Sequence, residues 1–187
     1  MAAGDAFAEG MNLRIMFQDE ARFGRMPVIR TSWAPSGTRP VVAAAVVRQY
    51  KYAYGALSPL DGDVDWMMAD AMNTATMNSF LAQIGEKYPD DYILMVVDGA
   101  SSHKSGMLQV PPNIHLLLLP SYCPELNPVE NLWDHLREKA CANVYFENLN
   151  DVVAKVSSEL EILASGTIEA AKNVSQMFCR SWIISSI

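Results

Sequence analysis

The first third of the chain consists of short apolar runs separated by turn residues. Residues 13–20 (LRIMFQDE) form an apolar run that ends in acids, and residues 41–57 are rich in β-branched and aromatic side chains, so both are predicted strands. The intervening TSWAPSGTRP holds the Pro and Gly of a turn, and Asp61-Gly62 can close a hairpin after the second strand. This part of the chain is therefore predicted to be an antiparallel meander.

A helix and two buried strands are predicted next. Residues 74–87 place four apolar side chains at helical spacing, and YPDD ends the helix; the four are Met77, Phe80, Leu81 and Ile84. Residues 91–99 are a continuous apolar run that ends in Asp98, and residues 113–120 repeat this pattern. Continuous apolar runs of this length are typical of strands buried on both faces.

The remainder of the chain is predicted to be helical, over residues 127 to about 140, 148–163 and 166–183. The order of elements indicates an α/β fold in which a mixed five-stranded sheet is flanked by helices. Because no repeat or linker interrupts the pattern, one domain is predicted for residues 13–187, preceded by an N-terminal extension of residues 1–12.

Composition adds that the chain is a folded protein of a reducing compartment. Half of its residues are hydrophobic and 19% are charged, which is ordinary for a globular domain. The three cysteines are widely spaced and form no CxxC pair, so neither a disulfide framework nor a zinc site is indicated. No apolar run reaches the ~18 residues of a membrane span. We therefore expect a cytoplasmic protein with no membrane partner.

The net charge of −7 argues against a protein that grips nucleic acid by bulk electrostatics, because such binding needs clustered Lys and Arg. The charge is compatible with an enzyme whose site gathers carboxylates that metal ions neutralise in use.

Three acids stand at the ends of predicted elements. Asp19 closes the first strand, Asp98 closes the central strand, and Glu130 lies in the first turn of the next helix. Because ligands gather at the carboxyl ends of strands in such sheets, the three side chains could converge there. Oxygen ligands favour Mg²⁺ or Mn²⁺, and two ions roughly 3.5–4 Å apart would support in-line phosphoryl displacement. That is the chemistry of nucleases and strand transfer.

Each acid also has a purely structural interpretation. An Asp after a strand is a common turn residue. Glu130 could complete a capping box, with Asn127 as N-cap and Pro128 at the first helical position. Both interpretations stay open at this stage.

Three blocks of the sequence, FQDEARFGR, MVVDGASSHKS and LLLLPSYCPELNPVENLWDHLREK, resemble in order and spacing the catalytic blocks of DDE transposases of the mariner-like bacterial insertion-sequence group. The third block is the most specific, and 31 residues lie between Asp98 and Glu130, close to the spacing of that group. The resemblance implies a ribonuclease H-like fold with Asp19, Asp98 and Glu130 as ligands of two Mg²⁺ or Mn²⁺ ions. It also implies cleavage of transposon-end DNA and strand transfer into target DNA by a homodimer, at the bacterial nucleoid.

The chain departs from this family in two places. Relatives usually carry an N-terminal helix-turn-helix region, whereas only about a dozen residues precede the first predicted strand here, so a separate helix-turn-helix polypeptide is a possible partner. Gly99 stands where relatives often have Asn. Two alternatives remain, a catalytically silent remnant that acts as an interaction module and another ribonuclease H-like nuclease.

Neighbouring residues have less specific roles. Alternation along the first strand puts Glu20 on the face opposite Asp19. Trp133 is predicted to be a core residue of the helix that carries Glu130. The candidates for contact with DNA, by resemblance for the first and as basic side chains for the others, are His103, Lys104, Arg22, Arg25 and Arg39.

Overall fold

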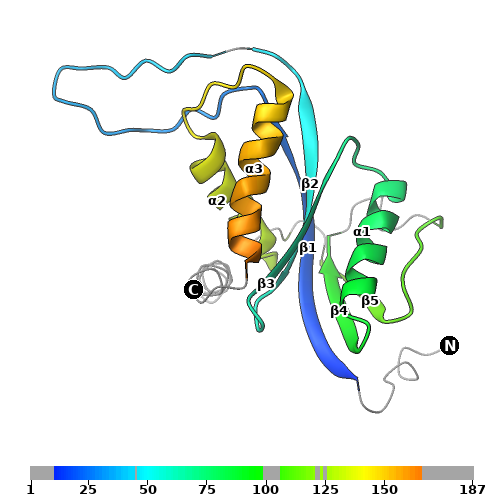
Figure 1. The fold of residues 1–187 in the computed structure, drawn as a ribbon. Helices are drawn as coiled ribbons and strands as arrows, with labels where there is room; N and C mark the ends of the chain where they lie inside the picture. Colours follow the sequence, from blue (N-terminus) through cyan, green and yellow to red (C-terminus); the bar gives the residue numbers. More distant parts are fainter. Residues whose placement is uncertain (1–10, 45, 99–105, 121–122, 124–125, 166–187) are drawn as a thin grey trace.

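The computed structural model describes residues 11–44, 46–98, 106–120, 123 and 126–165. A mixed five-stranded sheet in the order β3-β2-β1-β4-β5 forms its centre (Figure 1). β1 is antiparallel to β2 and parallel to β4, β2 is antiparallel to β3, and β4 is parallel to β5. The strands are β1 (Asn12–Gly24), β2 (Tyr50–Ser58), β3 (Asp63–Ala69), β4 (Asp91–Val97) and β5 (Ile114–Leu118).

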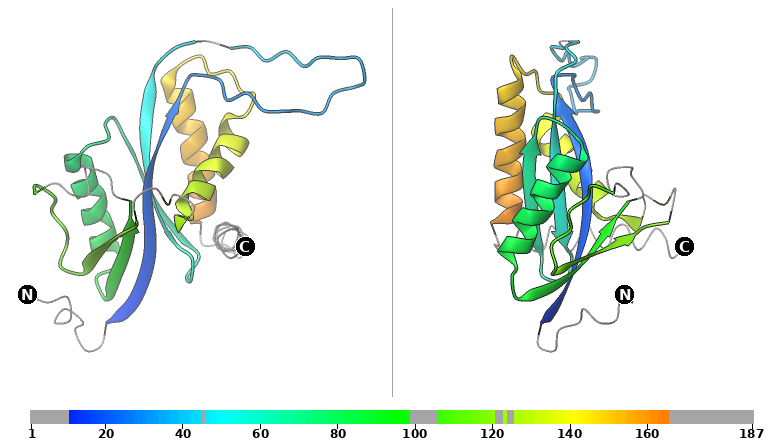
Figure 2. Two further views of the ribbon diagram at one scale, coloured as in Figure 1. Left: turned by 180° about the vertical axis from the view of Figure 1, so that it is seen from behind. Right: turned by 90° about the vertical axis from the view of Figure 1, so that its right-hand side faces the viewer.

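Helices cover the two faces of the sheet. α1 (Thr74–Lys87) lies on one face, and α2 (Val129–Leu136) and α3 (Leu149–Ala164) lie on the other (Figures 1 and 2). α2 continues directly into a short π-helix, η3 (Arg137–Cys141). The predicted α/β class, with a mixed five-stranded sheet flanked by helices, is confirmed.

Side-chain caps fix where the long helices begin. Asn73 accepts a hydrogen bond from the backbone N–H of Thr76 at the start of α1, at 2.9 Å. Asn148 and Asp151 form a reciprocal capping box at the start of α3. The four apolar residues predicted for the inner face of α1 are all buried. Both helices therefore follow from local sequence signals plus one apolar stripe.

The pairing of β1 with β4 keeps a constant register. It runs from Asn12 opposite Asp91 to Phe17 opposite Val96, so partners are always 79 residues apart in sequence. Near the start of this ladder, Arg14 binds the carboxylates of three acids at 2.6–3.0 Å, namely Asp61, Asp63 and Asp91. This cluster joins the β2–β3 hairpin to the central strands.

Alternation along β1 divides its side chains between two cores. Phe17, Ala21 and Phe23 face α2 and α3, whereas Met16 packs with α1 on the opposite side. Asp19 has the same parity as Phe17, and therefore belongs to the face that α2 covers.

Two predicted strand boundaries were wrong. β1 continues to Gly24, so Asp19 lies inside the strand instead of closing it, because β2 goes on pairing with β1 after β4 has ended. The second strand begins only at Tyr50. Residues 25–49 (the arm, described except for residue 45) instead form a long connection that projects from the sheet past α2 and α3 (Figures 1 and 2).

The last strand and the helices after it also differ from expectation. β5 is an edge strand in which Leu117 and Leu118 are exposed, so it is not buried on both faces as predicted. The predicted helix over 127–140 is divided into α2 and η3. The helix predicted over residues 166–183 lies outside the described residues.

Gly55 of β2 lets α2 lie close to the sheet. It pairs with Asp19 across the β1–β2 ladder, and a Cβ atom at this position would come within 2.6 Å of the indole of Trp133. A glycine inside a strand often marks such a close approach. The short distance between α2 and the sheet therefore depends on having a glycine, with no side chain, at position 55.

Gly55→Ala is expected to lower the free energy of unfolding by about 1–3 kcal/mol, because the added methyl group must displace the indole of Trp133. Urea denaturation measures the loss. Gly106→Ala is the matched control, since a Cβ atom there has nothing within 4 Å. Equal stability of the two variants would contradict close packing at Gly55.

Candidate active site

Asp19 is held by a direct hydrogen bond from the helix above it. The indole Nε1 of Trp133 donates to Oδ2 of Asp19 at 2.9 Å, and Trp133 is almost completely buried. The prediction that Trp133 is a core residue is confirmed, but its indole N–H also orients a carboxylate. One oxygen of Asp19 therefore has a fixed position.

The start of α2 is anchored to β1 next to Asp19. The buried Asn127 donates from Nδ2 to the carbonyl of Gln18 at 3.0 Å and accepts from the N–H of Val129 at 3.2 Å. Its backbone carbonyl also accepts the N–H of Glu130 at 3.2 Å. A single amide side chain thus links the strand position before Asp19 to the helix turn that carries Glu130.

The capping-box interpretation of Glu130 was wrong in its geometry. α2 begins at Val129, and Pro128 precedes it with helical torsion angles. Asn127 does supply a capping hydrogen bond, to Val129. Among the described residues, Glu130 makes no reciprocal hydrogen bond to the N–H of Asn127, and its side chain is exposed. The carboxylate of Glu130 is therefore not used to cap the helix.

Asp19 and Glu130 interact electrostatically. Burial raises the pKa of Asp19 from 3.8 to about 7, and the negative charge of Glu130 is the second largest cause of the increase. The hydrogen bond from Trp133 acts in the opposite direction by stabilising the ionised form. The protein thus keeps a carboxyl group in a place where its own environment disfavours the charge.

Asp98 lies at the same end of the sheet. It follows the last residue of β4, and the 79-residue register of the β1–β4 ladder, continued by two positions, brings it level with Asp19. Val96 belongs to the core under α2, so alternation also assigns Asp98 to that face. Even so, within the described residues no three His, Cys, Asp or Glu side chains lie close enough together to hold a metal ion.

The carboxylates of Asp19 and Glu130 are suitable ligands for a hard cation. Carboxylate oxygens are the ligands that Mg²⁺ and Mn²⁺ prefer. Within the described part of the chain, neither Asp19 nor Glu130 forms an ion pair with Lys or Arg, in contrast to the acids around Arg14. A bound cation would relieve the repulsion that raises the pKa of Asp19.

The remaining predicted residues are dispersed. Arg22 is exposed on β1, and its guanidinium lies over the ring of Tyr50. Arg25 donates to the carbonyl of Phe146 and to Gln49, and Arg39 is exposed in the arm. Glu20 is on the opposite face from Asp19, as predicted, where burial and then the charge of Glu20 raise the pKa of Tyr54. His103 and Lys104 lie outside the described residues.

Sequence reasoning did not identify three contributors to the site: the clamp by Asn127, the hydrogen bond from Trp133 and the close approach at Gly55. The glycine within the aromatic run YKYAYGALS was a usable signal of close packing. The other two are long-range contacts, whose partners are separated by 109 and by 114 positions in the sequence, and no local pattern indicates them.

The side chain of Gln18, which alternation places on the face of β1 opposite Asp19, is an anomaly. It is fully buried, and neither its Nε2 nor its Oε1 has a hydrogen-bond partner among the residues that the structure describes. An unpartnered buried amide costs about 1–3 kcal/mol. β1 therefore carries two unfavourable features at consecutive positions, the amide of Gln18 on the face of α1 and the disfavoured charge of Asp19 on the face of α2.

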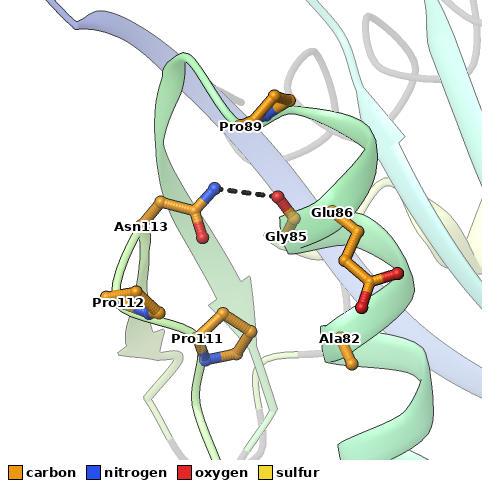
Figure 3. A pocket seen from close by; sticks show the side chains of 7 residues that line it. All are labelled: Ala82, Gly85, Glu86, Pro89, Pro111, Pro112 and Asn113. Carbon is orange, nitrogen blue, oxygen red and sulfur yellow. Dashed lines mark hydrogen bonds between the residues drawn. The ribbon is translucent and has the colours of Figure 1, made fainter.

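Away from the acids, a pocket of about 370 Å³ lies at the C-terminal end of α1 (Figure 3). Three prolines and Gly85 form its walls, and Glu86 contributes its one carboxylate. Asn113 donates to the carbonyls of Gly85 and Tyr88 at 3.1 and 3.0 Å. These hydrogen bonds satisfy backbone carbonyls at the C-terminal end of α1. One acid among apolar walls does not support metal or acid–base chemistry.

Comparison with known proteins gives a family match over most of the chain. Residues 14–153 match the family described as DDE superfamily endonuclease. An uncharacterised Sinorhizobium fredii protein, y4pE/y4sA, is 35% identical over 105 residues, which are 56% of this chain and 78% of that protein. The uncharacterised 39 kDa protein of insertion element IS630 from Shigella sonnei is 24% identical over 155 residues, covering 80% of this chain and 45% of that protein.

Solved structures with the same fold include complexes of the Mos1 transposase. A pre-cleavage Mos1 transpososome matches with a TM-score of 0.60 and 16% identity over 90% of this chain and 56% of that chain. The Mos1 mariner paired-end complex with Mn matches with a TM-score of 0.61 and 17% identity, over 90% and 55%. This similarity confirms the ribonuclease H-like fold expected from the sequence. The chain spans about half the length of these structures and of the Shigella protein.

In the metal-free protein, Asp19 is expected to make stability fall as the pH rises from about 4 to about 7. Its folded pKa of about 7 exceeds the ordinary 3.8, so the folded state holds a proton that the unfolded state has already released. The free energy of unfolding should fall by at most about 1.4 kcal/mol per pH unit, and this decrease should be complete above pH 7. Urea denaturation in EDTA at pH 5 and pH 8 measures it. Asp19→Asn should be less pH-dependent than the wild type, and identical profiles would contradict the assignment.

Trp133→Phe is expected to raise the pKa of Asp19 further, because the hydrogen bond that stabilises the ionised carboxylate is lost. NMR titration of the Asp19 side-chain carbon measures the change. Trp66→Phe is the matched control, since it removes an indole that packs against the same core without bonding to Asp19. A lower pKa in Trp133→Phe would show that the indole does not stabilise the charge.

Proposed function

This chain belongs to the DDE superfamily endonucleases, and from that premise we propose that it is the catalytic domain of a transposase. The proposed reaction is metal-dependent cleavage of DNA at transposon ends followed by strand transfer into target DNA. The IS630 protein and the Mos1 complexes support this assignment over other ribonuclease H-like nucleases.

The electrostatic contact between Asp19 and Glu130 is the observation that carries the proposal. The negative charge of Glu130, on a helix, helps to raise the pKa of Asp19, on a central strand, and neither carboxylate forms an ion pair with a described Lys or Arg. Asp98 directly follows the neighbouring strand β4, and the β1–β4 register, continued by two positions, brings it level with Asp19. We assign Asp19, Asp98 and Glu130 as the catalytic acids, in agreement with the order of acids expected from the sequence.

These three side chains would hold Mg²⁺ or Mn²⁺, two ions in our proposal. Mos1 paired-end complexes have been solved with Mn and with Mg, which supports the use of a divalent metal. When bound, such ions activate the attacking oxygen and stabilise the leaving oxygen of a phosphoryl displacement.

The protein's own residues keep the acids in place. Trp133 fixes one oxygen of Asp19, and Asn127 holds the first turn of α2 against β1, so that Glu130 is presented from a rigid helix end. Catalysis of this kind depends on positioning the donors before the reaction, because small misplacements cost large factors in rate.

The proposed partners are DNA and a second protomer. Mos1 has been solved in paired-end complexes with transposon ends, which supports a DNA substrate and an assembly with more than one copy. A separate helix-turn-helix polypeptide remains part of the proposal, as does a cytoplasmic, nucleoid-associated location. Among the described helices, none has the length and apolar character that a bilayer crossing requires.

A catalytically silent domain is the second candidate. It is favoured by one observation, that the described acids do not form a ready three-ligand cluster. In that case the acids would be structural and the domain would act by binding a partner.

Mg²⁺ or Mn²⁺ is expected to raise the melting temperature of the wild type, because binding only to the folded state stabilises it in proportion to ln(1 + [L]/Kd). Asp98→Ala should remove the shift, and Mn²⁺-dependent nicking of supercoiled plasmid should be lost with it. Glu130→Gln should not lower the stability of the metal-free protein, because its side chain is exposed, caps nothing and opposes the charge of Asp19, but should lose nicking.

Glu138→Gln is the matched control for Glu130→Gln, since it removes an exposed carboxylate from the adjoining η3. It should nick as the wild type does. Absence of both the metal shift and nicking in the wild type, also when a basic end-binding domain is supplied, would favour the silent domain.

A further inference from the structure

The root of the arm is attached to the segment that follows α2 and η3. Val28 and Ala142 form an isolated parallel bridge, and the N–H of Asn143 donates to the carbonyl of Val28 at 2.9 Å. Arg25 donates from Nε to the carbonyl of Phe146 at 3.3 Å. The first residues of the arm therefore lie along residues 142–146, and not against the sheet alone.

The side chain of Asn143 binds both main-chain groups of one arm residue. Its Nδ2 donates to the carbonyl of Arg30 at 3.1 Å, and its Oδ1 accepts the N–H of Arg30 at 3.0 Å. Two residues that face each other in an antiparallel sheet exchange the same pair of hydrogen bonds. The amide of Asn143 thus takes the place of a neighbouring strand where the arm leaves the domain.

The backbone of Asn143 has an uncommon conformation. Its φ is 56°, and among the described residues it is the only one other than glycine with a positive φ. Asn adopts this left-handed region more readily than most residues, although the region is unfavourable for L-amino acids in general. Uncommon torsion angles of this kind are often found at functional positions. Both the backbone and the side chain of Asn143 are therefore used to hold the arm.

Asn143 supplies the third contact that fixes the direction of the arm. The two ends of the arm meet at Arg25 and Gln49, where the main-chain N–H and the guanidinium of Arg25 donate to Gln49, both at 3.2 Å. A loop that is held only at its two ends can rotate about the line that joins them. The contact at Arg30 is made to a residue outside both strands, so it removes this rotation.

This contact also connects the arm to the helix that carries Glu130. η3 continues α2 without a break and ends at Cys141, two residues before Asn143. Ala140 and Cys141 are buried, so this segment is packed into the core. π-helices are rare and are frequently found at functional sites. Energetic coupling needs a continuous series of packed elements, and the arm, η3 and α2 form such a series.

The composition of the arm suits it to bind a polyanion. Among residues 25–49 there are four arginines and no acid, in a chain whose net charge is −7; the four are Arg25, Arg30, Arg39 and Arg48. In the proposed function the polyanion is DNA, whose backbone is contacted by basic side chains. DNA bound to the arm would exert a force on the root of the arm.

We propose that Asn143 is a positioning residue that couples the arm to the active site. By binding Arg30, it makes the arm, η3 and α2 move as one body. The direction of the arm is then transmitted to Glu130 and to the hydrogen bond between Trp133 and Asp19. The role in cleavage rests on the proposed function, whereas the mechanical connection can be measured in the metal-free chain.

The test uses Asn143→Gly, which permits the left-handed backbone but lacks the amide. Backbone ¹⁵N–¹H NOE values over residues 26–32 should decrease, because the root of the arm is released. The indole N–H signal of Trp133 should shift or broaden, because its bond to Asp19 is less well held. In Mn²⁺-dependent nicking, kcat should fall about tenfold or more, because small misplacements of catalytic groups cost large factors in rate.

Asn78→Ala is the matched control, because Asn78 makes the same kind of bidentate contact on the other face of the sheet. It donates to the carbonyl of Met107 at 3.2 Å and accepts the N–H of Gln109 at 2.8 Å. This variant should leave the Trp133 signal and kcat unchanged. A loss of stability alone would affect both variants, whereas coupling affects only Asn143→Gly.

Arg30→Gln separates the main-chain contact from the side-chain ion pair of Arg30 with Glu138, which is exposed and 3.7 Å long. Such pairs contribute little, so the Trp133 signal should stay as in the wild type. Asn143→Asp keeps the acceptor for the N–H of Arg30 and loses only the donor. It should change the Trp133 signal in the same direction as Asn143→Gly, but less.

Hydrogen exchange in the wild type needs no variant, so the attachment stays testable if Asn143→Gly fails to fold. The N–H of Arg30 should exchange about tenfold or more slowly than that of Arg39, which has no hydrogen-bond partner among the described residues. Equal exchange rates would overturn the attachment on which the proposal depends.

An unchanged Trp133 signal and kcat in Asn143→Gly, with lower NOE values in the arm, would overturn the coupling. The proposed function would then stand, because nicking is intact. If the Trp133 signal responded but the wild type did not nick DNA, the coupling would stand and the proposed function would fail.

Discussion

The hydrogen bond from the indole of Trp133 to the carboxylate of Asp19 is the constraint on which the rest of the site depends. It joins a central strand to the helix that carries Glu130, and it forms only because Gly55 leaves room for the indole against β2. Asn127 anchors the same helix one residue upstream on β1. The spacing between the acids is therefore set by packed, buried groups and not by a flexible loop.

This arrangement favours function over stability. Burial and the nearby Glu130 oppose the charge on Asp19, and on the opposite face of β1 Gln18 keeps a buried amide that has no partner in the described part of the chain. A protein selected for stability alone would replace such groups with apolar ones at little cost. Unfavourable local features of this kind are commonly concentrated at active sites, where they are part of the mechanism.

Much of this could be predicted from the sequence. The amphipathic pattern gave α1 its full extent, Asp61-Gly62 marked the β2–β3 hairpin, and the parity of residues 13–20 assigned Asp19 and Glu20 to opposite faces. The boundary of β1 was wrong because β2 goes on pairing with it after β4 has ended, and the boundary of β2 was wrong because β propensity along residues 41–49 is not matched by a partner strand. Trp133 and Asn127 show the more general limit: their side chains are ordinary core and turn residues until a contact over a hundred positions away gives them a role.

The 79-residue separation between β1 and β4 also has a consequence for how the chain is made. During synthesis β1 can pair with β2 once residue 58 has emerged, but the edge that receives β4 must wait until residue 97. At about 5–20 residues per second this leaves an apolar strand edge open for roughly 2–8 seconds. Unpaired edges of this kind invite pairing with other nascent chains, and a charged residue on the edge is a common protection. Arg14 is a charged residue on that edge, and two of its three partners, Asp61 and Asp63, are translated before Asp91, so this part of the edge carries charge while it waits for β4.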